Sequence, residues 1–415
     1  MSKIAVVGSG ISGLTSAWLL SEQHEVTVFE ANDYLGGHTA TVDVELGGKA
    51  LAVDTGFIVF NDRTYPLFQR LLSRIGVSAT PTEMSFSVHH AQTGLEYNGH
   101  TLGSMFAQRA NLFKPQFYGF LAEILRFNLL CKKVIKDGEL TDGDNLGNFL
   151  ERYGFSAFFT GHYILPMVAA IWSSSLADSQ DVPLAFFLRF FHHHGLLNLV
   201  DRPQWYVVKG GSRSYIPALT APLKDIRLNT PVLGVCRHSA GVRVTTHAGE
   251  EAFDEVVLAC HSDQALRLLT DASAQEQQVL GSLAYRDNEV ILHTDIRLLP
   301  VERRAWASWN YWLDGTENAP PAVTYNMNIL QGIDSEHTLC VTLNRGHAIA
   351  PDKIIRRFTY AHPVYSRGTI QAQGRRREIC GQRHTHFCGA YWYNGFHEDG
   401  VKSALDVCAR FGISL

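Results

Sequence analysis

Three glycines near the start of the chain, Gly8, Gly10 and Gly13, have the spacing of a loop that can hold a phosphate. In such a loop the first glycine allows a tight turn, the second lets the backbone approach a pyrophosphate, and the third lets a helix pack closely on a strand. Unpaired N–H groups at the start of that helix, together with the helix dipole, attract the phosphates. The pattern therefore predicts a dinucleotide-binding loop. Its residues are Gly8, Ser9, Gly10, Ile11, Ser12 and Gly13.

The elements that must position this loop flank it in the sequence. Residues 4–7 are apolar and predict a buried strand, and the apolar-rich stretch 11–21 predicts a helix. A second strand is expected over 25–30; it ends in Glu30, which Ala31 follows. An acid about twenty residues beyond the glycines can accept hydrogen bonds from the ribose hydroxyls of an adenosine. Strand, loop, helix, strand and acid together predict the opening βαβ unit of a dinucleotide-binding domain.

The segment after the acid indicates which dinucleotide is bound. Gly36 and Gly37 form a second glycine pair, which His38 and Thr39 follow. This extension resembles that of flavoproteins of the amine oxidase, protoporphyrinogen oxidase and phytoene desaturase superfamily. In that superfamily the pair leads into an arginine, and His38 stands at this position here. The resemblance implies FAD as the cofactor, with these four residues among its contacts.

Three further segments resemble places where the chain returns to the FAD domain in this superfamily. After a hairpin expected over 42–53, Gly56 and Phe57 are expected to pass close to the cofactor. The doublet Gly210-Gly211 resembles the turn that opens a helix and leads the chain back to the FAD domain. Val232 ends a strand expected over 226–232, and by resemblance its backbone would bind the adenine.

The C-terminal segment resembles the closing flavin motif of the same superfamily, a strand, a loop and a final helix over 385–405. In that motif, backbone N–H groups at the helix start meet the pyrimidine edge of the flavin and stabilise its reduced charge. The resemblance assigns this role to Gly400 and Val401. Relatives carry an acid directly after the strand's glycine, but an alanine follows Gly389 here. Glu398 or Asp399 is therefore expected to hold the ribityl chain.

The catalytic residue that the resemblance suggests is His293. Relatives with amine oxidase activity place a lysine near flavin N5 on the strand that corresponds to residues 288–295, and this stretch contains no lysine. His293 is the nearest polar substitute, with a cross-strand or surface role as the alternative. The sequence leaves two roles open for Asp54: it can be an acid near the flavin, or a turn or cap residue. No metal site is expected: residues 192–194 are consecutive histidines, and consecutive positions on a helix point in different directions.

The resemblance covers the chain from end to end and implies an amine-oxidase-like α/β fold with two domains. The FAD-binding Rossmann-like domain is expected to be discontinuous and to comprise residues 1–70, 206–285 and 378–415. Residues 71–205 and 286–377 are expected to form an α+β substrate domain. A length of 415 residues and a hydrophobic content of 46% are sufficient for two buried cores.

Composition excludes several classes of function and suggests a compartment. The net charge of −4 and the lack of a basic tail argue against nucleic acid as a partner. The seven cysteines include no CxxC pair and predict reduced thiols in a cytoplasmic protein. Because residues 4–7 already form the first strand, no signal peptide is expected, and no apolar run is long enough to cross a bilayer. The sequence does not predict an oligomeric state.

One aromatic-rich helix, expected within residues 111–137, has two interpretations. Lys132, Lys133 and Lys136 flank its apolar stretch. It can be a core helix of the substrate domain, or it can contact a membrane surface or an acyl chain. Charge and apolarity alone do not separate these alternatives. We therefore expect a cytoplasmic protein with a possible peripheral membrane contact.

The overall pattern resembles bacterial flavoproteins that are often encoded beside cyclopropane-fatty-acid synthases, which implies a small-molecule or acyl-lipid substrate. The first hypothesis is an FAD-dependent oxidoreductase that removes hydride from a carbon centre of an apolar substrate, in the manner of a desaturase. A flavin amine oxidase is the alternative. A third possibility is a non-catalytic flavin-bound partner in a lipid-modifying complex. The chain contains one dinucleotide-binding loop, so reoxidation would need oxygen, a quinone or another carrier.

Overall fold

Strands from three distant parts of the chain form one parallel sheet in the computed structural model, which describes residues 1–138, 143–316 and 318–415. The strand order is β10-β2-β1-β14-β20. The strands are β1 (Lys3–Val7), β2 (Glu25–Phe29), β10 (Asp225–Arg227), β14 (Glu255–Leu258) and β20 (Thr385–Phe387). β1 and β14 are buried along almost their whole length, which explains their continuous apolar sequences, because a parallel sheet is covered on both faces.

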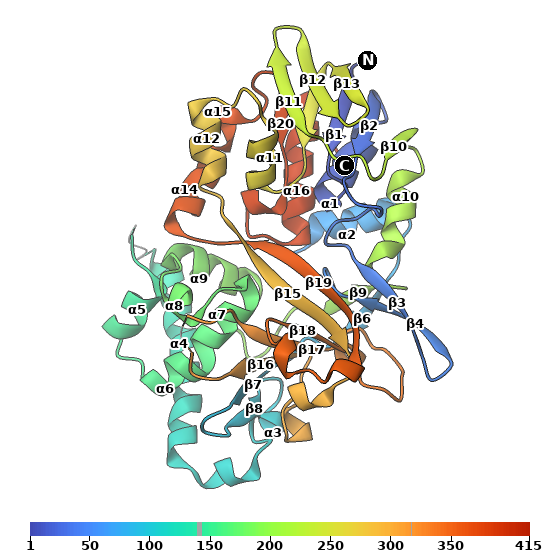
Figure 1. The fold of residues 1–415 in the computed structure, drawn as a ribbon. Helices are drawn as coiled ribbons and strands as arrows, with labels where there is room; N and C mark the ends of the chain where they lie inside the picture. The colour runs from blue at the N-terminus through green and yellow to red at the C-terminus, as the bar shows by residue number, and fades with distance from the viewer. Residues whose placement is uncertain (139–142, 317) are drawn as a thin grey trace.

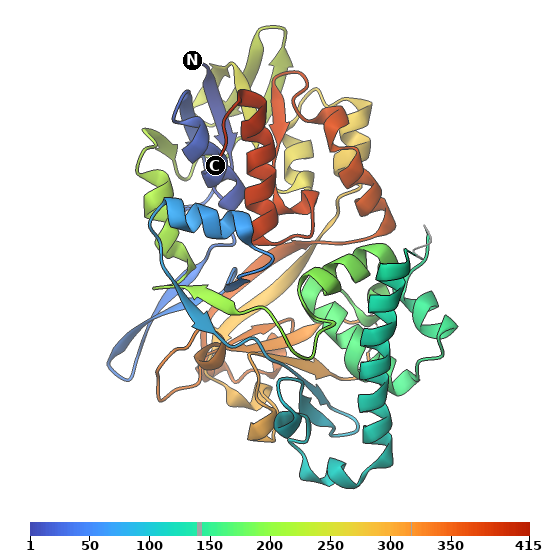
Figure 2. The same ribbon diagram turned by 180° about the vertical axis from the view of Figure 1, so that it is seen from behind.

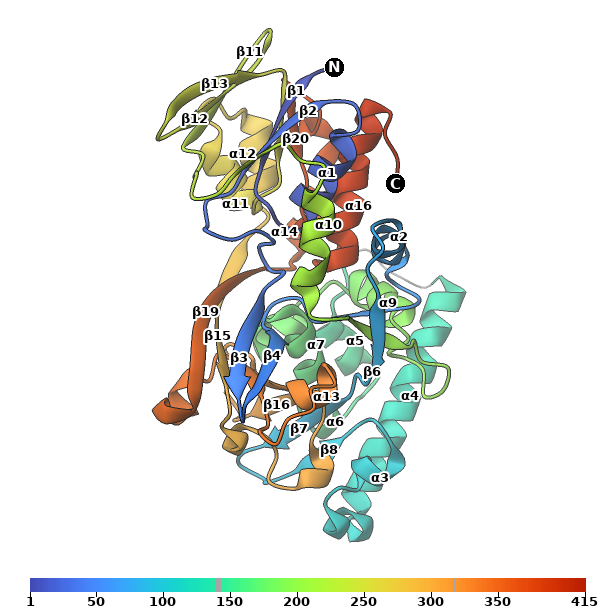
Figure 3. The same cartoon turned by 90° about the vertical axis from the view of Figure 1, so that its right-hand side faces the viewer.

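Two different layers cover the faces of this sheet (Figure 3). On one face α1 (Ile11–Leu20) packs beside the C-terminal helix α16 (His397–Cys408). The other face carries an antiparallel meander, β11 (Gly234–His238), β12 (Gly241–Thr246) and β13 (Gly249–Phe253), with helices α11 (Ser262–Leu268) and α12 (Ala274–Gly281). The predicted βαβ opening is confirmed, as is the mixed α/β class of the fold.

A seven-stranded sheet forms the lower part of the molecule in Figure 1. Its order is β19-β15-β18-β17-β16-β7-β8, and only the β7–β16 pair is parallel among the described strands of this sheet. The strands are β7 (Phe86–His90), β8 (Glu96–Asn98), β15 (Tyr285–His293), β16 (Trp309–Leu313), β17 (Ala322–Asn326), β18 (Cys340–Leu343) and β19 (Ile354–Pro363). The long strands β15 and β19 form a ribbon that leads from the upper part into this sheet (Figure 1).

Helices pack around an aromatic core beside the second sheet (Figure 2). They are α4 (Pro115–Asp137), α5 (Leu146–Arg152), α6 (Ala157–Phe159), α7 (Leu165–Trp172), α8 (Leu176–Gln180) and α9 (Leu184–His193). The expected long helix is α4, which starts with a proline in its first turn and ends at Gly138 in a left-handed conformation. Its buried face recurs every three or four residues, from Phe117 through Ile124 to Cys131, so α4 is an amphipathic core helix.

Smaller elements complete the fold. The predicted hairpin is β3 (Thr41–Leu46) with β4 (Lys49–Asp54), and β9 (Trp205–Val208) lies between β5 (Val59–Asn61) and β6 (Ala79–Thr82). The remaining helices are α2 (Pro66–Arg74), α3 (Leu102–Met105), α10 (Ile216–Thr220), α13 (Met327–Leu330), α14 (Arg367–Gly374) and α15 (Arg376–Ile379). Among the described residues, no helix combines the length and the apolarity needed to span a membrane.

Two glycines in helices should respond oppositely to alanine. A Cβ at Gly13 would overlap the carbonyl oxygen of Gly8, so Gly13→Ala should lower the free energy of unfolding by about 3 kcal/mol. Gly119 lies on the exposed face of α4, and a Cβ there would meet no described atom within 4 Å. Gly119→Ala should therefore raise stability by about 0.5–1 kcal/mol. Urea unfolding of the flavin-free variants measures the two changes in the free energy of unfolding. Equal changes in the two variants would contradict the packing assigned to Gly13.

Candidate functional site

The three glycines of the loop between β1 and α1 have different surroundings. Gly8 has a φ of +103°, and its N–H donates to the carbonyl of Phe29 at 2.8 Å. A Cβ at Gly13 would overlap the Gly8 carbonyl oxygen and lie 3.1 Å from Cβ of Ala259. A Cβ at Gly10, in contrast, would meet no described atom within 4 Å. Gly8 and Gly13 fit the chain against itself, whereas Gly10 faces open space at the start of α1.

Backbone donors are available beside that open space. The first hydrogen bond of α1 runs from Leu14 N–H to the Gly10 carbonyl at 2.9 Å. The N–H groups of Ile11, Ser12 and Gly13 therefore have no partner within the helix. Together with the positive end of the helix dipole, they form a place where a phosphate can bind.

Glu30 ties the glycine loop to the end of β2. The N–H and the hydroxyl of Ser9 donate to Glu30 Oε2 at 3.0 and 2.5 Å, and the backbone and side-chain N–H groups of Asn32 donate to Oε1 at 2.9 and 3.0 Å. The carboxylate is 6% exposed, whereas neighbouring Ala31 is exposed. A ribose hydroxyl that reached Glu30 would replace one of the two side-chain donors.

The second glycine pair lies directly on the first loop. Gly36 forms a parallel bridge with Gly10, and its N–H donates to the Ser9 carbonyl at 3.1 Å. A Cβ at Gly37 would lie 3.3 Å from Gly10 Cα, and Gly36 and Gly37 both have positive φ angles. The two loops therefore approach more closely here than side chains would allow.

The return of the chain after β4 meets the same loop at His38. Phe57 N–H donates to the His38 carbonyl at 2.7 Å, and a Cβ at Gly56 would overlap that carbonyl oxygen. Asp54, just before it, accepts hydrogen bonds from the N–H and the hydroxyl of Ser212, both at 2.9 Å. Asp54 is thus a cap that joins β4 to the turn after Gly210 and Gly211, and burial raises its pKa to about 6.

His38 belongs to a group of partly buried histidines at the junction of the two sheets. Its ring centroid lies 5.2 Å from that of Tyr360 and 5.8 Å from those of His261 and His362. Burial, and then the neighbouring histidines, lower the pKa of His38 to about 3, and burial lowers that of His362 to about 4. These two rings are therefore uncharged near neutral pH. Among the described residues, Nε2 of His38 has no hydrogen-bond partner.

Two residues of this region, His397 and Tyr215, were not predicted from the sequence. The ring of His397, at the start of α16, stacks on Phe57 with a centroid distance of 3.5 Å. Its Nε2 lies 3.0 Å from the hydroxyl of Tyr215 and 3.2 Å from that of Thr39, and these two hydroxyls also contact each other. The sequence carries no signal for this contact, because the three segments are far apart along the chain.

The structure corrects three expectations for the C-terminal helix. The Gly400 N–H donates to the Phe396 carbonyl at 3.0 Å, and Val401 lies in the next turn, so neither is at the helix start. Gly400 instead allows α16 to approach α1, because a Cβ there would lie 2.6 Å from Ile11 Cγ2. Both oxygens of Glu398 accept hydrogen bonds from the first N–H groups of α2, so this carboxylate caps α2 rather than facing the glycine loop.

Asp399 also acts as a cap. Its Oδ2 accepts a hydrogen bond from the Phe396 N–H at 2.9 Å, and burial raises the pKa of its carboxyl to about 7. The N–H of Gly389 donates to the Ser403 hydroxyl at 2.8 Å, which ties β20 to α16. Val232 lies in the loop after β10, which ends at Arg227 instead of 232, and its side chain packs into the core around the parallel sheet.

The structure does not bring His293 to the glycine loop. His293 is the last residue of β15, whereas Tyr285, the first, stacks on His261 at 4.2 Å. A strand of this length separates its ends by about 26 Å. Both ring nitrogens of His293 have protein partners, Thr342 Oγ1 at 2.7 Å and the Asp295 N–H at 3.0 Å. The cross-strand alternative is therefore the role that the structure gives to His293.

Aromatic side chains of the lower part meet the start of α16. Phe190 stacks on Phe396 with a centroid distance of 5.3 Å, Phe186 stacks on Tyr365 at 5.1 Å, and Trp172 lies 4.8 Å from Phe190. We refer to these five residues as the aromatic cluster. Trp172 Nε1 and the Tyr365 hydroxyl are buried without a hydrogen-bond partner among the described residues.

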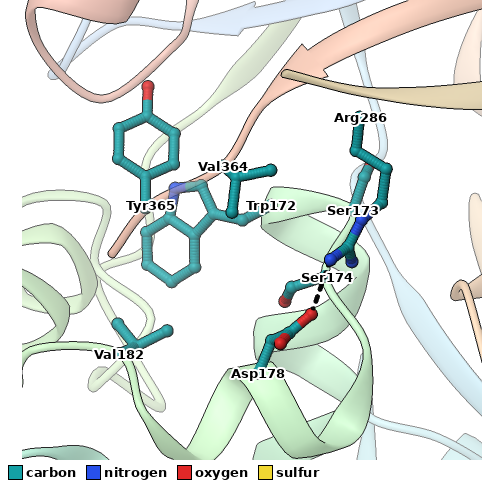
Figure 4. Close-up of a pocket in the computed structure, with 8 residues that line it drawn as sticks. All are labelled: Trp172, Ser173, Ser174, Asp178, Val182, Arg286, Val364 and Tyr365. Carbon is teal, nitrogen blue, oxygen red and sulfur yellow. Dashed lines mark hydrogen bonds and ion pairs between the residues drawn. The ribbon is translucent and has the colours of Figure 1, made fainter. Parts of the chain in front are cut away.

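A cavity of about 10 Å³ lies beside this cluster, enough for one water molecule (Figure 4). Trp172 and Tyr365 line one part of it, and the ion pair between Arg286 and Asp178, with an N–O distance of 2.9 Å, lies on another side (Figure 4). The described cavity is thus polar on one side and aromatic on the other.

A dinucleotide fits the arrangement of the glycine loop. Gly10 leaves space at a helix start with three unused N–H groups, and Glu30 lies at the end of the neighbouring strand. His38 Nε2, which has no described partner, lies in the second loop that contacts Gly10. The open space at Gly10 and the unused N–H groups are the features expected of a site that binds a phosphate-containing group.

Comparisons with known proteins agree with this geometry. Residues 11–299 match the family of flavin-containing amine oxidoreductases. A Mycobacterium tuberculosis protein described as a flavin-containing monoamine oxidase is 25% identical over 62% of this chain and 56% of its own length. Carotenoid phi-ring synthase of Streptomyces griseus is 28% identical over 70% of this chain and 57% of its own. The matches thus span little more than half the length of these curated relatives.

A solved structure shows the same fold. The crystal structure of a protein described as a protoporphyrinogen oxidase, from Exiguobacterium sp. 255-15, superposes with a TM-score of 0.70 at 18% identity and covers 99% of this chain and 98% of its own. The family match extends over more than half of the 415 residues, and the resemblance noted in the sequence is confirmed. The chain belongs to the flavin-containing amine oxidoreductase family, whose cofactor is FAD.

Proposed function

We propose that this protein is an FAD-dependent oxidoreductase that removes hydride from a carbon centre of an apolar substrate, with a fatty-acyl chain as the candidate class. In this proposal the FAD-binding domain comprises residues 1–70, 206–285 and 378–415, which supply the five strands of the parallel sheet. Residues 71–205 and 286–377 form the substrate domain. The pyrophosphate lies at Gly10 and the start of α1, the ribose at Glu30, and the flavin towards His38, Phe57 and the start of α16.

The composition of the junction between the domains carries this proposal. The aromatic cluster places buried apolar side chains next to the start of α16, and His38 and His362 are uncharged. An amine carries a positive charge near neutral pH and would lose its hydration here. The nearby carboxyl of Asp399 is already bound to the Phe396 N–H. An uncharged, apolar substrate suits these surroundings better. Carotenoid phi-ring synthase, one of the relatives, is named for an apolar carotenoid.

The chain's own residues would bind the substrate, exclude water from the site and stabilise negative charge. When bound, FAD supplies a two-electron acceptor. The aromatic cluster would orient an apolar chain and exclude water, which strengthens electrostatic interactions in the site. The N–H groups at the start of α16, before Gly400, would stabilise negative charge that develops next to them. Oxidation of a C–C bond to a C=C bond also releases a proton, which a base at the site would have to accept.

An amine oxidase is the second candidate. The Mycobacterium tuberculosis relative is described as a flavin-containing monoamine oxidase, and aromatic rings can also enclose an amine in its neutral form. The two candidates differ in the substrate that delivers electrons, so a direct measurement of flavin reduction separates them.

The cofactor position predicts a variant that folds but does not bind FAD. Gly10→Val introduces a side chain into open space, with a backbone conformation that any residue can adopt, so the unfolding temperature of the flavin-free protein should stay unchanged. The added methyl groups would occupy the proposed pyrophosphate position, and FAD affinity should fall at least about a hundredfold. Flavin fluorescence titration measures this. Undiminished binding would place the cofactor elsewhere.

The substrate class is tested by anaerobic reduction of the bound flavin. Acyl lipids should bleach the flavin absorbance, and primary amines should not. Phe190→Asp, which places a charge in the aromatic cluster, should slow bleaching at least about tenfold, whereas Phe190→Leu should retain most of it. Leu129→Asp makes a similar change on the exposed face of α4 and serves as the control. Bleaching by amines alone would establish the second candidate.

The uncharged histidines predict loss of stability in acid. Because the pKa of His362 is lower in the folded protein than its ordinary 6.5, the unfolded chain takes up a proton first as the pH falls. Stability should therefore decrease between about pH 6.5 and 4. From pH 7.5 to 5 the flavin-free wild type should lose about 1–2 kcal/mol more than His362→Gln. The buried carboxyls act in the opposite direction, but equally in both proteins.

Urea unfolding at the two pH values measures the difference. His193→Gln changes an exposed histidine and should keep the wild-type pH dependence. If His362→Gln and the wild type lost equal stability, His362 would not be held uncharged by the fold.

A further inference from the structure

His362 lies at the junction of the two sheets, on the ribbon of β15 and β19 that joins the two parts of the molecule (Figure 1). Its ring centroid is 5.8 Å from that of His38, in the loop that contacts Gly10. Tyr360, on the same face of β19, also lies against His38, and its hydroxyl is 3.0 Å from Thr55 Oγ1. His362 is therefore next to the proposed position of the flavin.

A chain of hydrogen bonds that starts at two backbone groups orients the side-chain amide of Asn344. Its Oδ1 accepts from the Glu289 N–H at 3.0 Å, and its Nδ2 donates to the Pro321 carbonyl at 3.1 Å. Because a backbone N–H only donates and a carbonyl only accepts, these contacts fix which end of the amide is nitrogen. The same Nδ2 donates to Asn288 Oδ1 at 2.8 Å, so the amide of Asn288 is oriented too.

Asn288 turns its nitrogen towards His362. Asn288 is fully buried, and its Nδ2 donates to the Arg286 carbonyl at 3.2 Å and lies 3.3 Å from His362 Nδ1. An amide nitrogen can only donate, so Nδ1 is the acceptor in this contact. Burial lowers the pKa of His362 to about 4, so the ring is neutral near pH 7 and has one N–H. The fold therefore selects the tautomer that carries this proton on Nε2.

Ser173 favours the same tautomer. Its hydroxyl lies 2.8 Å from His362 Nδ1 and donates to it. Ser173 ends α7 in a left-handed conformation with a φ of +50°, where glycine is the usual residue. A glycine would fit this helix end with less strain but would lack the hydroxyl. The end of α7 thus presents a second donor to Nδ1.

Nε2 of His362 remains available for a bound molecule. Among the described residues none forms a hydrogen bond with it, and it is not one of the fully buried polar atoms that lack a partner. The side chain is partly exposed, so Nε2 has surface that a ligand can reach. Nε2 of His38, in contrast, is buried. His362 therefore presents a fixed N–H donor at the junction.

We propose that His362 is a catalytic residue whose Nε2–H donates a hydrogen bond to the flavin ring and stabilises the negative charge that the ring gains on reduction. Asn288 and Ser173 are positioning residues, because they act through the tautomer of His362. This inference rests on the proposed function, since it requires FAD with its ring towards His38. A neutral N–H suits this role because it stabilises developing charge while its proton stays on the protein.

The midpoint reduction potential of the FAD-loaded protein tests the proposal without any substrate. His362→Phe keeps an aromatic ring and removes the N–H. The reduced cofactor should then be stabilised at least about tenfold less, a fall of about 30 mV for a two-electron couple. His362→Gln can accept from Asn288 through its oxygen and donate through its nitrogen, so it should keep most of the wild-type potential. His193→Phe changes an exposed histidine and should have no effect.

Nitrogen-15 NMR of histidine-labelled protein tests the tautomer directly. In the flavin-free protein, the signals that disappear in His362→Gln should show an unprotonated Nδ1 and a protonated Nε2. Asn288→Asp replaces the amide donor with a carboxylate, which can only accept, so Nδ1 of His362 should become protonated. Loading the wild type with FAD should shift the Nε2 signal of His362 and leave the signals of His193 unchanged.

The inference is overturned if Nδ1 of His362 carries the proton in the wild type, or if FAD does not shift the Nε2 signal. It is also overturned if His362→Phe keeps the wild-type potential, or if His362→Gln loses as much as His362→Phe. A protein that bound no FAD would contradict the proposed function itself, so the two failures are distinguishable. The NMR measurement on the wild type decides the question if His362→Phe does not fold.

Discussion

The close approach of Gly13 to the carbonyl of Gly8 holds the first turn of α1 against the parallel sheet, and the geometry of the cofactor site depends on it. The same turn receives two other segments through glycines. Gly37 approaches Gly10 from the second loop, and Gly400 approaches Ile11 from α16. Because these contacts leave no room for side chains, three segments that are distant in the sequence converge on one helix start. Gly10 remains the glycine of this loop that faces open space.

Two effects limit the charge around the site. Backbone N–H groups bind the buried carboxylates, and burial keeps the histidines uncharged. Asp54, Glu398 and Asp399 each accept hydrogen bonds from the start of a helix or helical turn, so these carboxylates join elements to one another. His38 and His362 are kept uncharged by burial. The junction therefore has little free charge, because the acids near the C-terminal motif act as caps. This agrees with the proposal of an apolar substrate.

Helix α7 separates two groups of unsatisfied polar atoms in the lower part of the molecule. At its end, Trp172 Nε1 and the Tyr365 hydroxyl are donors near the start of α16. Just before its start, His162 Nε2 is a buried acceptor without a partner among the described residues. Eight helical residues span about 12 Å, so the unsatisfied atoms at the two ends of α7 are well separated.

The sequence by itself determined the opening βαβ unit, the hairpin, the long amphipathic helix and the family, because each is encoded in a local pattern of apolar residues and glycines. Only the tertiary structure decided where α16 begins, that Glu398 caps α2, and that His293 lies at the far end of β15 from the histidine group. It also brought His38 next to His362 and Tyr360. The physical reason is that local sequence restricts the backbone of one segment, whereas the partner of a buried polar group depends on how distant segments pack.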